Sequence, residues 1–217
     1  LIASGVELIG DVELFARINT KPVVAVTGSN GKSTVVTLAH KMLSDAGKQV
    51  ALAGNIGIPV LDAVNDVVDG YLLELSSFQL ESSHKLPLKA AVYLNTSEDH
   101  MDRYDAFDDY VAAKQRIYDN CELAVFNRQD QTTFPPKKQA SLSLGLDESS
   151  EGYGFDGDFI TLNGKALVNA EDIKVIGRHN ILNAQAALAI AEQFECEQPK
   201  VIESLKQFTG LEHRFEF

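Results

Sequence analysis

A glycine-rich segment between an apolar run and a helical pattern constrains the fold of this chain most strongly. Residues 27–34 read Thr-Gly-Ser-Asn-Gly-Lys-Ser-Thr, and they follow the apolar run Val23 to Val26 directly. The residues after the segment place their apolar side chains on one face of a helix. Such a connection can hold an anion, because glycines let the backbone approach a ligand and the N–H groups at the helix start point at it. The sequence therefore predicts a polyphosphate-binding loop made of Gly28, Ser29, Asn30, Gly31, Lys32, Ser33 and Thr34.

The loop is shorter than the usual phosphate-binding loop. That pattern has a glycine five residues before its Gly-Lys pair, whereas Val26 stands at that position here. The segment is thus a shortened variant in which Lys32 supplies the positive charge. A tight connection that binds no ligand is the alternative that the segment alone leaves open.

The rest of the chain indicates an α/β fold. Apolar runs at residues 49–53, 71–75, 90–94 and 123–126 lack alternation, and helical patterns cover residues 107–118, 180–194 and 200–208. Runs of this kind are typical of a mostly parallel sheet flanked by helices. After a break at Pro135-Pro136, the pattern changes over residues 139–172 to short alternating pieces, with an Asn163-Gly164 turn between 159–162 and 166–168. This part is expected to form a small antiparallel β appendage.

Length and charge exclude several classes of partner. A chain of 217 residues can bury one main core. Its 19 basic and 31 acidic residues give a formal charge of -12, which repels nucleic acid and anionic membrane surfaces. Cys121 and Cys196 show neither a disulfide framework nor metal spacing, and no apolar run approaches membrane-spanning length. We expect a cytoplasmic monomer that binds neither nucleic acid nor membrane.

Polar side chains at the predicted strand ends are candidates for chemistry, because ligands of open parallel sheets lie beyond the carboxyl ends of the strands. Glu74 is the only charge in the run 71–75. A buried carboxylate is costly unless it is paired or bound to a metal, so Glu74 and the Ser33 hydroxyl could share a magnesium ion. The alternative is a strand end that emerges into water.

His100 and Lys114 each leave two interpretations open. His100 lies in the acidic run 95–103 after a predicted strand, where it is either a surface or capping histidine or part of a reaction site. Lys114 falls within the apolar stripe of the helix 107–118, so its amine is aimed inward. Either the stem packs and the head escapes to water, or the amine is partly desolvated and has a lowered pKa.

Asn180 and Asn183 are one helical turn apart on the same face. Their side-chain amides could pair with a purine edge, or Asn180 could cap the helix while Asn183 is merely exposed.

Taken together, these segments resemble the central domain of the Mur ligases. The matching stretches span nearly the whole chain in order, and the shortened phosphate loop is that family's own form. Within the family, the runs Leu-Ser-Ser-Phe-Gln-Leu and Glu-Asp-His-Met-Asp favour the ligase that adds D-glutamate to UDP-N-acetylmuramoyl-L-alanine. The stretches that carry the resemblance are residues 10–15, 26–34, 54–57, 73–81, 98–104, 112–114, 179–183 and 208–216.

The resemblance implies an ATP-dependent amide ligation in peptidoglycan precursor synthesis, through an acyl phosphate. It implies two magnesium sites, one with Ser33 and Glu74 and one with His100 and a carbamylated Lys114. The catalytic residues would be Lys32, His100 and Lys114, with Gly31 to Thr34 around the phosphates. Asn55 and Ser76 would lie near the substrate, Asn180 and Asn183 near adenine, and Arg214 near the ATP phosphates.

The resemblance also implies a fragment of a longer protein. Residues 1–21 would be a remnant of an amino-terminal domain, 22–213 the ATP-binding domain, and 214–217 the start of a linker to a carboxy-terminal domain. Such a fragment is expected to fold but to be inactive alone. Two alternatives stay open: another amide ligase of the same fold, such as a folylpolyglutamate synthase or a different Mur ligase, and a nucleotide-binding module without catalysis.

Overall fold

The computed structural model describes residues 7, 9–175 and 177–211. Its centre is a sheet of six strands in the order β2-β3-β1-β4-β5-β6, and every neighbouring pair in it is parallel. The α/β prediction is confirmed. The strands are β1 (Val23–Thr27), β2 (Val50–Gly54), β3 (Gly70–Glu74), β4 (Leu88–Tyr93), β5 (Cys121–Asn127) and β6 (Ser141–Leu144).

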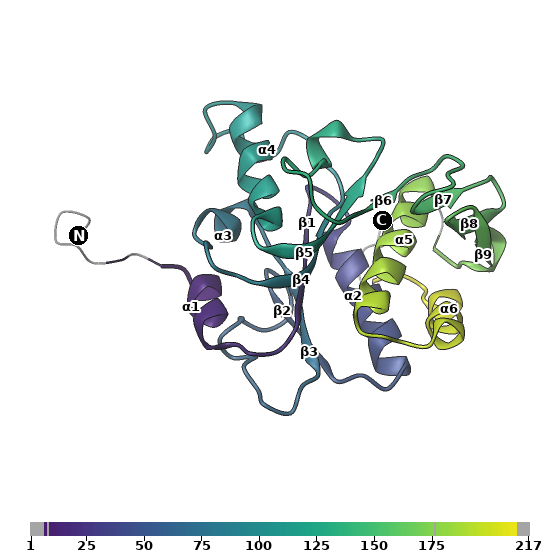
Figure 1. Ribbon diagram of the computed structural model, residues 1–217, viewed down its shortest axis with the longest axis horizontal. Coiled ribbons are helices and arrows are strands. Elements are labelled where there is room, and N and C mark those ends of the chain that lie inside the picture. The colour runs from purple at the N-terminus through teal and green to yellow at the C-terminus, as the bar shows by residue number, and fades with distance from the viewer. Residues whose placement is uncertain (1–6, 8, 176, 212–217) are drawn as a thin grey trace.

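Helices cover both faces of this sheet (Figure 1). One face carries α2 (Lys32–Asp45), α5 (Arg178–Gln193) and α6 (Gln198–Gln207), and the other carries α1 (Asp11–Ile18), α3 (Ser77–Glu81) and α4 (Phe107–Gln115). Short 3-10 turns lie at Arg116–Tyr118, Gln131–Thr133 and Ala170–Asp172. The chain therefore forms a three-layer sandwich.

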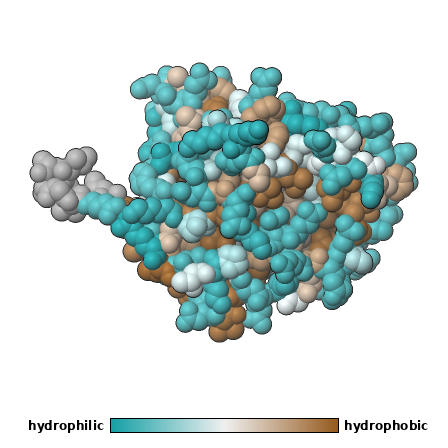
Figure 2. All heavy atoms as spheres, in the orientation of Figure 1, coloured by the Kyte–Doolittle hydropathy of each residue, from teal (hydrophilic) through white to brown (hydrophobic). Residues whose placement is uncertain are grey.

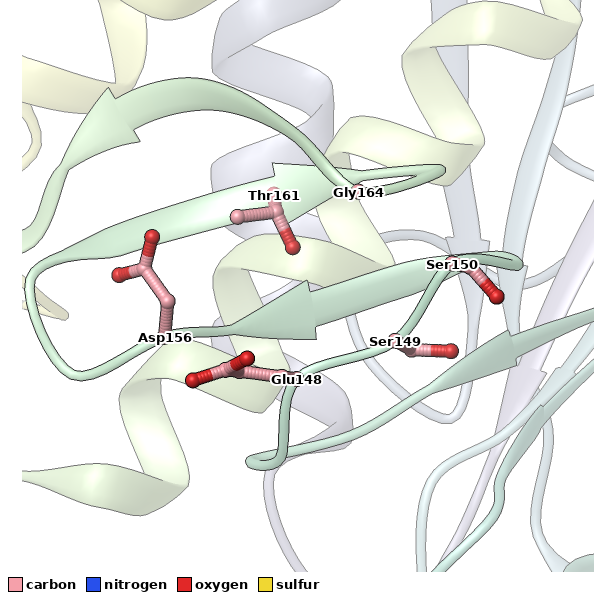
Figure 3. A pocket seen from close by; sticks show the side chains of 6 residues that line it. All are labelled: Glu148, Ser149, Ser150, Asp156, Thr161 and Gly164. Carbon is pink, nitrogen blue, oxygen red and sulfur yellow. The ribbon is translucent and has the colours of Figure 1, made fainter.

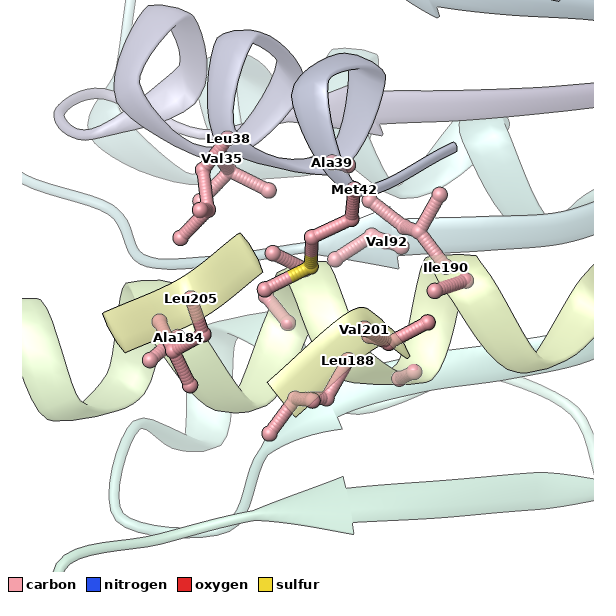
Figure 4. Close-up of a cluster of buried hydrophobic side chains, with 14 of the residues drawn as sticks. Val35, Leu38, Ala39, Met42, Val92, Ala184, Leu188, Ile190, Val201 and Leu205 are labelled. Atoms are coloured by element: carbon pink, nitrogen blue, oxygen red, sulfur yellow. The ribbon is translucent and has the colours of Figure 1, made fainter. Parts of the chain in front are cut away.

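The side chains of β1 show why both faces must be covered. Val24 and Val26 pack toward α2 and α5, whereas Val23 and Ala25 pack toward α1, and all four are at most 1% exposed. Figure 4 shows the first of these two cores, in which side chains of α2, α5 and α6 meet those of the sheet. A central parallel strand buried on both sides accounts for the apolar run without alternation.

A second, antiparallel sheet packs beside α5. It consists of β7 (Tyr153–Phe155), β8 (Phe159–Leu162) and β9 (Lys165–Asn169), and the predicted turn at Asn163-Gly164 joins the last two. The fully buried Gln185 of α5 holds this sheet in place. Its amide nitrogen donates to the carbonyls of Gly145 and Gly154, and its oxygen accepts from the Gly145 N–H. The predicted β appendage is confirmed.

Two elements differ from the expectation. Residues 141–144, which the sequence pattern assigns to the appendage, form β6, the sixth strand of the main sheet, because they pair in parallel with β5, with Ala124 opposite Ser141. Helix α1 was not predicted, and it buries Val12 and Phe15 against the sheet. It lies within residues 1–21, so the assignment of that range to another domain stays a prediction.

The surface in Figure 2 is mostly hydrophilic on the face shown, with apolar residues gathered in patches. Leu14 and Ile18 of α1 are 41% and 53% exposed, so this helix buries one face and leaves apolar side chains on the other. Among the described helices, none is both long and apolar enough to cross a bilayer.

Candidate functional site

The loops that follow β1, β3 and β4 leave the sheet side by side. Strands β3 and β4 lie on either side of β1, with Val26 paired to Glu74 and Thr27 paired to Tyr93. Because all three strands are parallel, their carboxyl ends share one edge of the sheet. This register brings the phosphate loop, Glu74 and the loop that carries His100 to the same place.

Gly31 is the residue that precedes helix α2 as its N-cap, and it shapes the phosphate loop. Its φ of 84° is left-handed, and a Cβ built on it would lie 2.7 Å from Oδ1 of Asn183. The first-turn N–H groups of Lys32, Ser33 and Thr34 have no acceptor within the helix, which is the usual source of an anion site at a helix start. Glycine is thus required here both by its backbone conformation and by its contact with α5.

We predict that Gly31→Ala destabilises the isolated chain. An alanine in the left-handed region costs about 1–2 kcal/mol, and its methyl group would push Asn183 away. Urea unfolding followed by circular dichroism measures this loss. Gly47→Ala is the matched control, because its φ of 87° is equally left-handed but nothing lies within 4 Å of its added Cβ. Equal losses in the two variants would show that the contact with Asn183 does not matter.

Lys32 folds back over the phosphate loop. Its Nζ lies 2.8 Å from the Gly28 carbonyl and 3.1 Å from the Ser29 carbonyl and donates to both. The ammonium group therefore sits at the loop and does not extend away from it.

Lys114 is buried at the same carbonyl. Only 2% of it is exposed, its Nζ donates to the Gly28 carbonyl at 3.0 Å, and the amine lies 4.7 Å from the centre of the Tyr110 ring. Burial and, to a smaller extent, the nearby Lys32 ammonium together lower the pKa of Lys114 to about 7, against an opposite effect of Asp99. Of the two interpretations, the desolvated amine is correct and the escape of the head to water is wrong.

Glu74 is a buried carboxylate with one oxygen that has no partner. The residue is 2% exposed, Oε1 accepts from Nδ2 of Asn55 at 2.9 Å, and Oε2 has no hydrogen-bond partner among the described residues. The alternative prediction, that the strand end at Glu74 emerges into water, is therefore wrong. Because a buried anionic oxygen without a partner is costly, Glu74 fits the role of a cation ligand.

His100 lies on the exposed loop after β4, with a left-handed φ of 55°. Its Nε2 is 3.6 Å from Oδ2 of Asp99, and its ring centre is 5.1 Å from that of Phe78. Within the described residues, no three His, Cys, Asp or Glu side chains cluster closely enough to hold a metal by themselves. A metal here would need ligands from elsewhere, such as phosphate oxygens.

Asn180 and Asn183 line a cavity of about 250 Å³ beside the phosphate loop, together with Asn30, Gly31 and Thr34. The two asparagines are 8% and 6% exposed, and Nδ2 of Asn183 donates to Oδ1 of Asn180 at 3.0 Å. Gly177 is the residue that caps α5, so the alternative of a capping Asn180 and an exposed Asn183 is wrong.

Ser76 and Arg214 complete the predicted set. Ser76 follows β3 and caps α3, where its Oγ accepts from the Gln79 N–H at 3.3 Å. Arg214 lies outside the described residues. The phosphate loop, Asn55, Glu74, His100, Lys114, Asn180 and Asn183 are all placed by the structure.

Sequence reasoning missed Asn95 and Tyr110. Asn95 makes three hydrogen bonds with the backbone of Ser29 and Asn30, and the Tyr110 hydroxyl lies 3.3 Å from Oγ of Ser29. An asparagine at the end of a strand carries both a donor and an acceptor, which is the only signal that the sequence offered.

A larger cavity, of about 340 Å³, lies on the small sheet (Figure 3). It is lined by Glu148, Ser149, Ser150, Asp156, Thr161 and Gly164, none of which belongs to the predicted site. Its carboxylates suit a polyphosphate poorly, because like charges repel. Cavity size alone therefore does not identify a site for a polyphosphate.

Several known proteins are similar to this chain in sequence. A family model described as the Mur ligase middle domain matches residues 26–191. UDP-N-acetylmuramoylalanine--D-glutamate ligase of Vibrio campbellii is 48% identical over 216 residues, which are 99% of this chain and 49% of that protein. The enzyme of the same name from Haemophilus influenzae (strain 86-028NP) is 43% identical over 220 residues, 99% of this chain and 50% of that protein. The chain thus spans about half the length of the curated relatives it matches.

Solved structures share the fold. A UDP-N-acetylmuramoyl-L-alanyl-D-glutamate--2,6-diaminopimelate ligase superposes with a TM-score of 0.74 at 22% identity, over 94% of this chain and 49% of that one. The UDP-N-acetylmuramate-alanine ligase of Thermotoga maritima gives 0.68 at 23% identity, over 90% of this chain and 47% of that one.

Proposed function

We propose, from the fact that this chain belongs to the Mur ligase middle-domain family, that it is the ATP-binding part of a ligase that adds D-glutamate to UDP-N-acetylmuramoyl-L-alanine. The relatives that carry this name match almost the whole of the chain. The single observation that carries the proposal is the unpartnered Oε2 of Glu74 beside the phosphate loop, because it leaves a place for a cation next to bound phosphates.

The proposed reaction has two steps. In the first, a carboxylate oxygen of UDP-N-acetylmuramoyl-L-alanine attacks the γ-phosphorus of ATP, and ADP leaves. In the second, the amine of D-glutamate attacks the carbon of the acyl phosphate, loses a proton and expels inorganic phosphate. Both steps bring anions together, so catalysis consists of positioning and of neutralising charge.

The chain's own residues are suited to that task. The amides of residues 31–34 would hold phosphate oxygens, and the Lys32 ammonium would exchange the Gly28 and Ser29 carbonyls for phosphate. Asn55 would hold one oxygen of Glu74 so that the other faces the ligand. Magnesium, when bound by Glu74 and Ser33, would supply further neutralisation of the phosphate charge.

Lys114 is proposed to act as a carbamate with His100 at a second metal. Near its pKa of about 7, much of the amine is unprotonated, and a free amine adds to carbon dioxide to form an anionic carbamate with release of a proton. Intact mass spectrometry under native conditions tests this. Bicarbonate should add the mass of one carbon dioxide to the wild-type chain but not to Lys114→Met. The same addition to both proteins would show that the carbamate forms at another amine.

The adenine is proposed to occupy the cavity at Asn180 and Asn183. The boundaries at residues 21 and 213, the cytoplasmic location and the monomeric state stay predictions.

Phosphate release by the full-length protein tests the proposed function. With ATP, magnesium and UDP-N-acetylmuramoyl-L-alanine, release should require D-glutamate and should not occur with L-lysine or with a folate in place of the muramoyl substrate. The isolated chain should release none. Activity with L-lysine would favour another Mur ligase, folate-dependent activity a folylpolyglutamate synthase, and nucleotide binding without any ligation a non-catalytic module.

A further inference from the structure

Six hydrogen bonds tie the phosphate loop to the loop after β4, where the two loops leave neighbouring strands. Three involve Asn95: the Ser29 N–H donates to its carbonyl (3.0 Å), the Asn30 N–H donates to its Oδ1 (2.9 Å), and its Nδ2 donates to the Asn30 carbonyl (3.0 Å). Three involve Ser97: its Oγ accepts from Nδ2 of Asn30 (3.2 Å), its carbonyl accepts from Oγ of Ser29 (3.1 Å), and its N–H donates to that same Oγ (3.0 Å).

The Asn95 side chain satisfies both backbone groups of Asn30. A side-chain amide suits this contact because it carries a donor and an acceptor on separate atoms, whereas an ionised carboxylate has no donor and an alanine has neither. The register of the sheet fixes the contact, since β1 and β4 pair up to Thr27 and Tyr93, and the Leu94 N–H donates to the Thr27 carbonyl at 3.0 Å. Asn95 is the next residue after Leu94, at the point where the strands part.

This arrangement decides which amides can serve a phosphate. The N–H groups of Ser29 and Asn30 donate to Asn95, so the proposed phosphate donors are the amides of residues 31–34, at the start of α2. Asn95 itself belongs to the loop after β4, and His100 lies in the same loop, five residues after Asn95. Lys114 of α4 also contacts the phosphate loop, because its Nζ donates to the Gly28 carbonyl.

We propose that Asn95 is a positioning residue that joins the phosphate loop and the loop carrying His100 into one unit, so that phosphate binding at the first is transmitted to the second. Its effect on the reaction rests on the proposed function, since it assumes that residues 31–34 hold phosphates. The coupling itself is a property of the chain and can be measured without the ligase reaction.

Asn95→Ala tests the proposal, with Asn19→Ala as the matched control. Asn19 makes the same paired contact with a backbone far from the site: its Nδ2 donates to the Lys21 carbonyl at 2.8 Å, and its Oδ1 accepts from the Lys21 N–H at 3.0 Å. In Asn95→Ala, hydrogen exchange at the amides of Ser29, Asn30 and Ser97 should become at least about 10-fold faster, and in Asn19→Ala it should not change. Unchanged exchange in Asn95→Ala would overturn the proposal.

A second readout separates positioning from general stability. Inorganic tripolyphosphate, added to the isolated chain, should shift the NMR amide signals of Lys32 and of His100 in the wild type and in Asn19→Ala. In Asn95→Ala the Lys32 signal should still shift and the His100 signal should not. Asn95→Asp keeps the acceptor for the Asn30 N–H, so exchange at Asn30 should stay closer to that of the wild type than it does in Asn95→Ala. A His100 shift that persists in Asn95→Ala would contradict the coupling, whereas a full-length protein without D-glutamate ligation would leave the exchange result standing.

Discussion

Replacing Lys114 with methionine is expected to stabilise the isolated chain at neutral pH by roughly 3–4 kcal/mol. The lysine is buried, and its pKa falls from 10.5 to about 7 because burial and the Lys32 ammonium both disfavour the cation. The unfolded chain therefore binds a proton more readily than the folded chain over that range. Methionine has a similar volume and no charge, so it removes this cost.

The pH dependence gives the same prediction a second test. The pKa of Lys114 is lower in the folded chain than in the unfolded chain. Its burial therefore costs most stability below pH about 7, the cost falls between pH about 7 and 10.5, and it is absent above that. Between pH 7 and 9 the contribution of Lys114 should amount to about 2 kcal/mol. Urea unfolding at both pH values measures it, in buffers free of carbon dioxide. Lys114→Met should lack this rise.

Lys137→Met is the control for that experiment. The Lys137 side chain is 75% exposed, so its replacement should change stability by less than about 0.5 kcal/mol and leave the pH dependence as it is. If Lys114→Met behaves like Lys137→Met, Lys114 is solvated, and the desolvated amine proposed for the carbamate does not exist.

Glu74→Gln is expected to lower ligation by the full-length protein about 100-fold or more, with little effect on stability. The substitution keeps the shape of the side chain and removes the charge that a magnesium ion needs. Stability should change by less than about 1 kcal/mol, because among residues 7, 9–175 and 177–211 the carboxylate has one hydrogen-bond partner, Asn55, and its Oε2 has none.

Glu13 provides the contrasting buried carboxylate. It is 0% exposed, its Oε2 accepts from the N–H groups of His84 and Lys85, and its Oε1 accepts from Arg17. Glu13→Gln should therefore cost about 3 kcal/mol of stability, since the new NH₂ group faces other donors, and the folded protein should keep its activity. Phosphate-release assays and urea unfolding on both variants separate the roles. If Glu74→Gln is stable and fully active, Glu74 is not a metal ligand in the reaction.

The sequence predicted the parts of the site that depend on local pattern. Lys114 falls within the apolar stripe of its helix, and this spacing alone placed its amine inside, where the structure has it. The strand, loop and helix around Lys32 could also be predicted, because the glycine-rich loop and the start of the helix depend on residues that are close in the sequence.

What the sequence could not predict depends on partners that are distant along the chain. Asn95 meets Asn30 across 65 residues, through a strand register that no local pattern specifies. Similarly, residues 141–144 alternate like an edge strand in either sheet, and only their pairing with β5 assigns them. Glu13 lies in a short helix whose two buried apolar residues, Val12 and Phe15, gave too short a pattern to recognise.

The proposed function requires that the phosphates of a nucleotide bind at residues 31–34. An NMR titration of the isolated chain with magnesium and ATP tests it most directly, through the backbone amide signals. We expect the largest shifts at Gly31, Lys32, Ser33 and Thr34, smaller shifts at Asn180 and Asn183, and the loss of all of them in Lys32→Met. Shifts that instead gather at Glu148 and Thr161 on the small sheet, or that are unchanged in Lys32→Met, would contradict it.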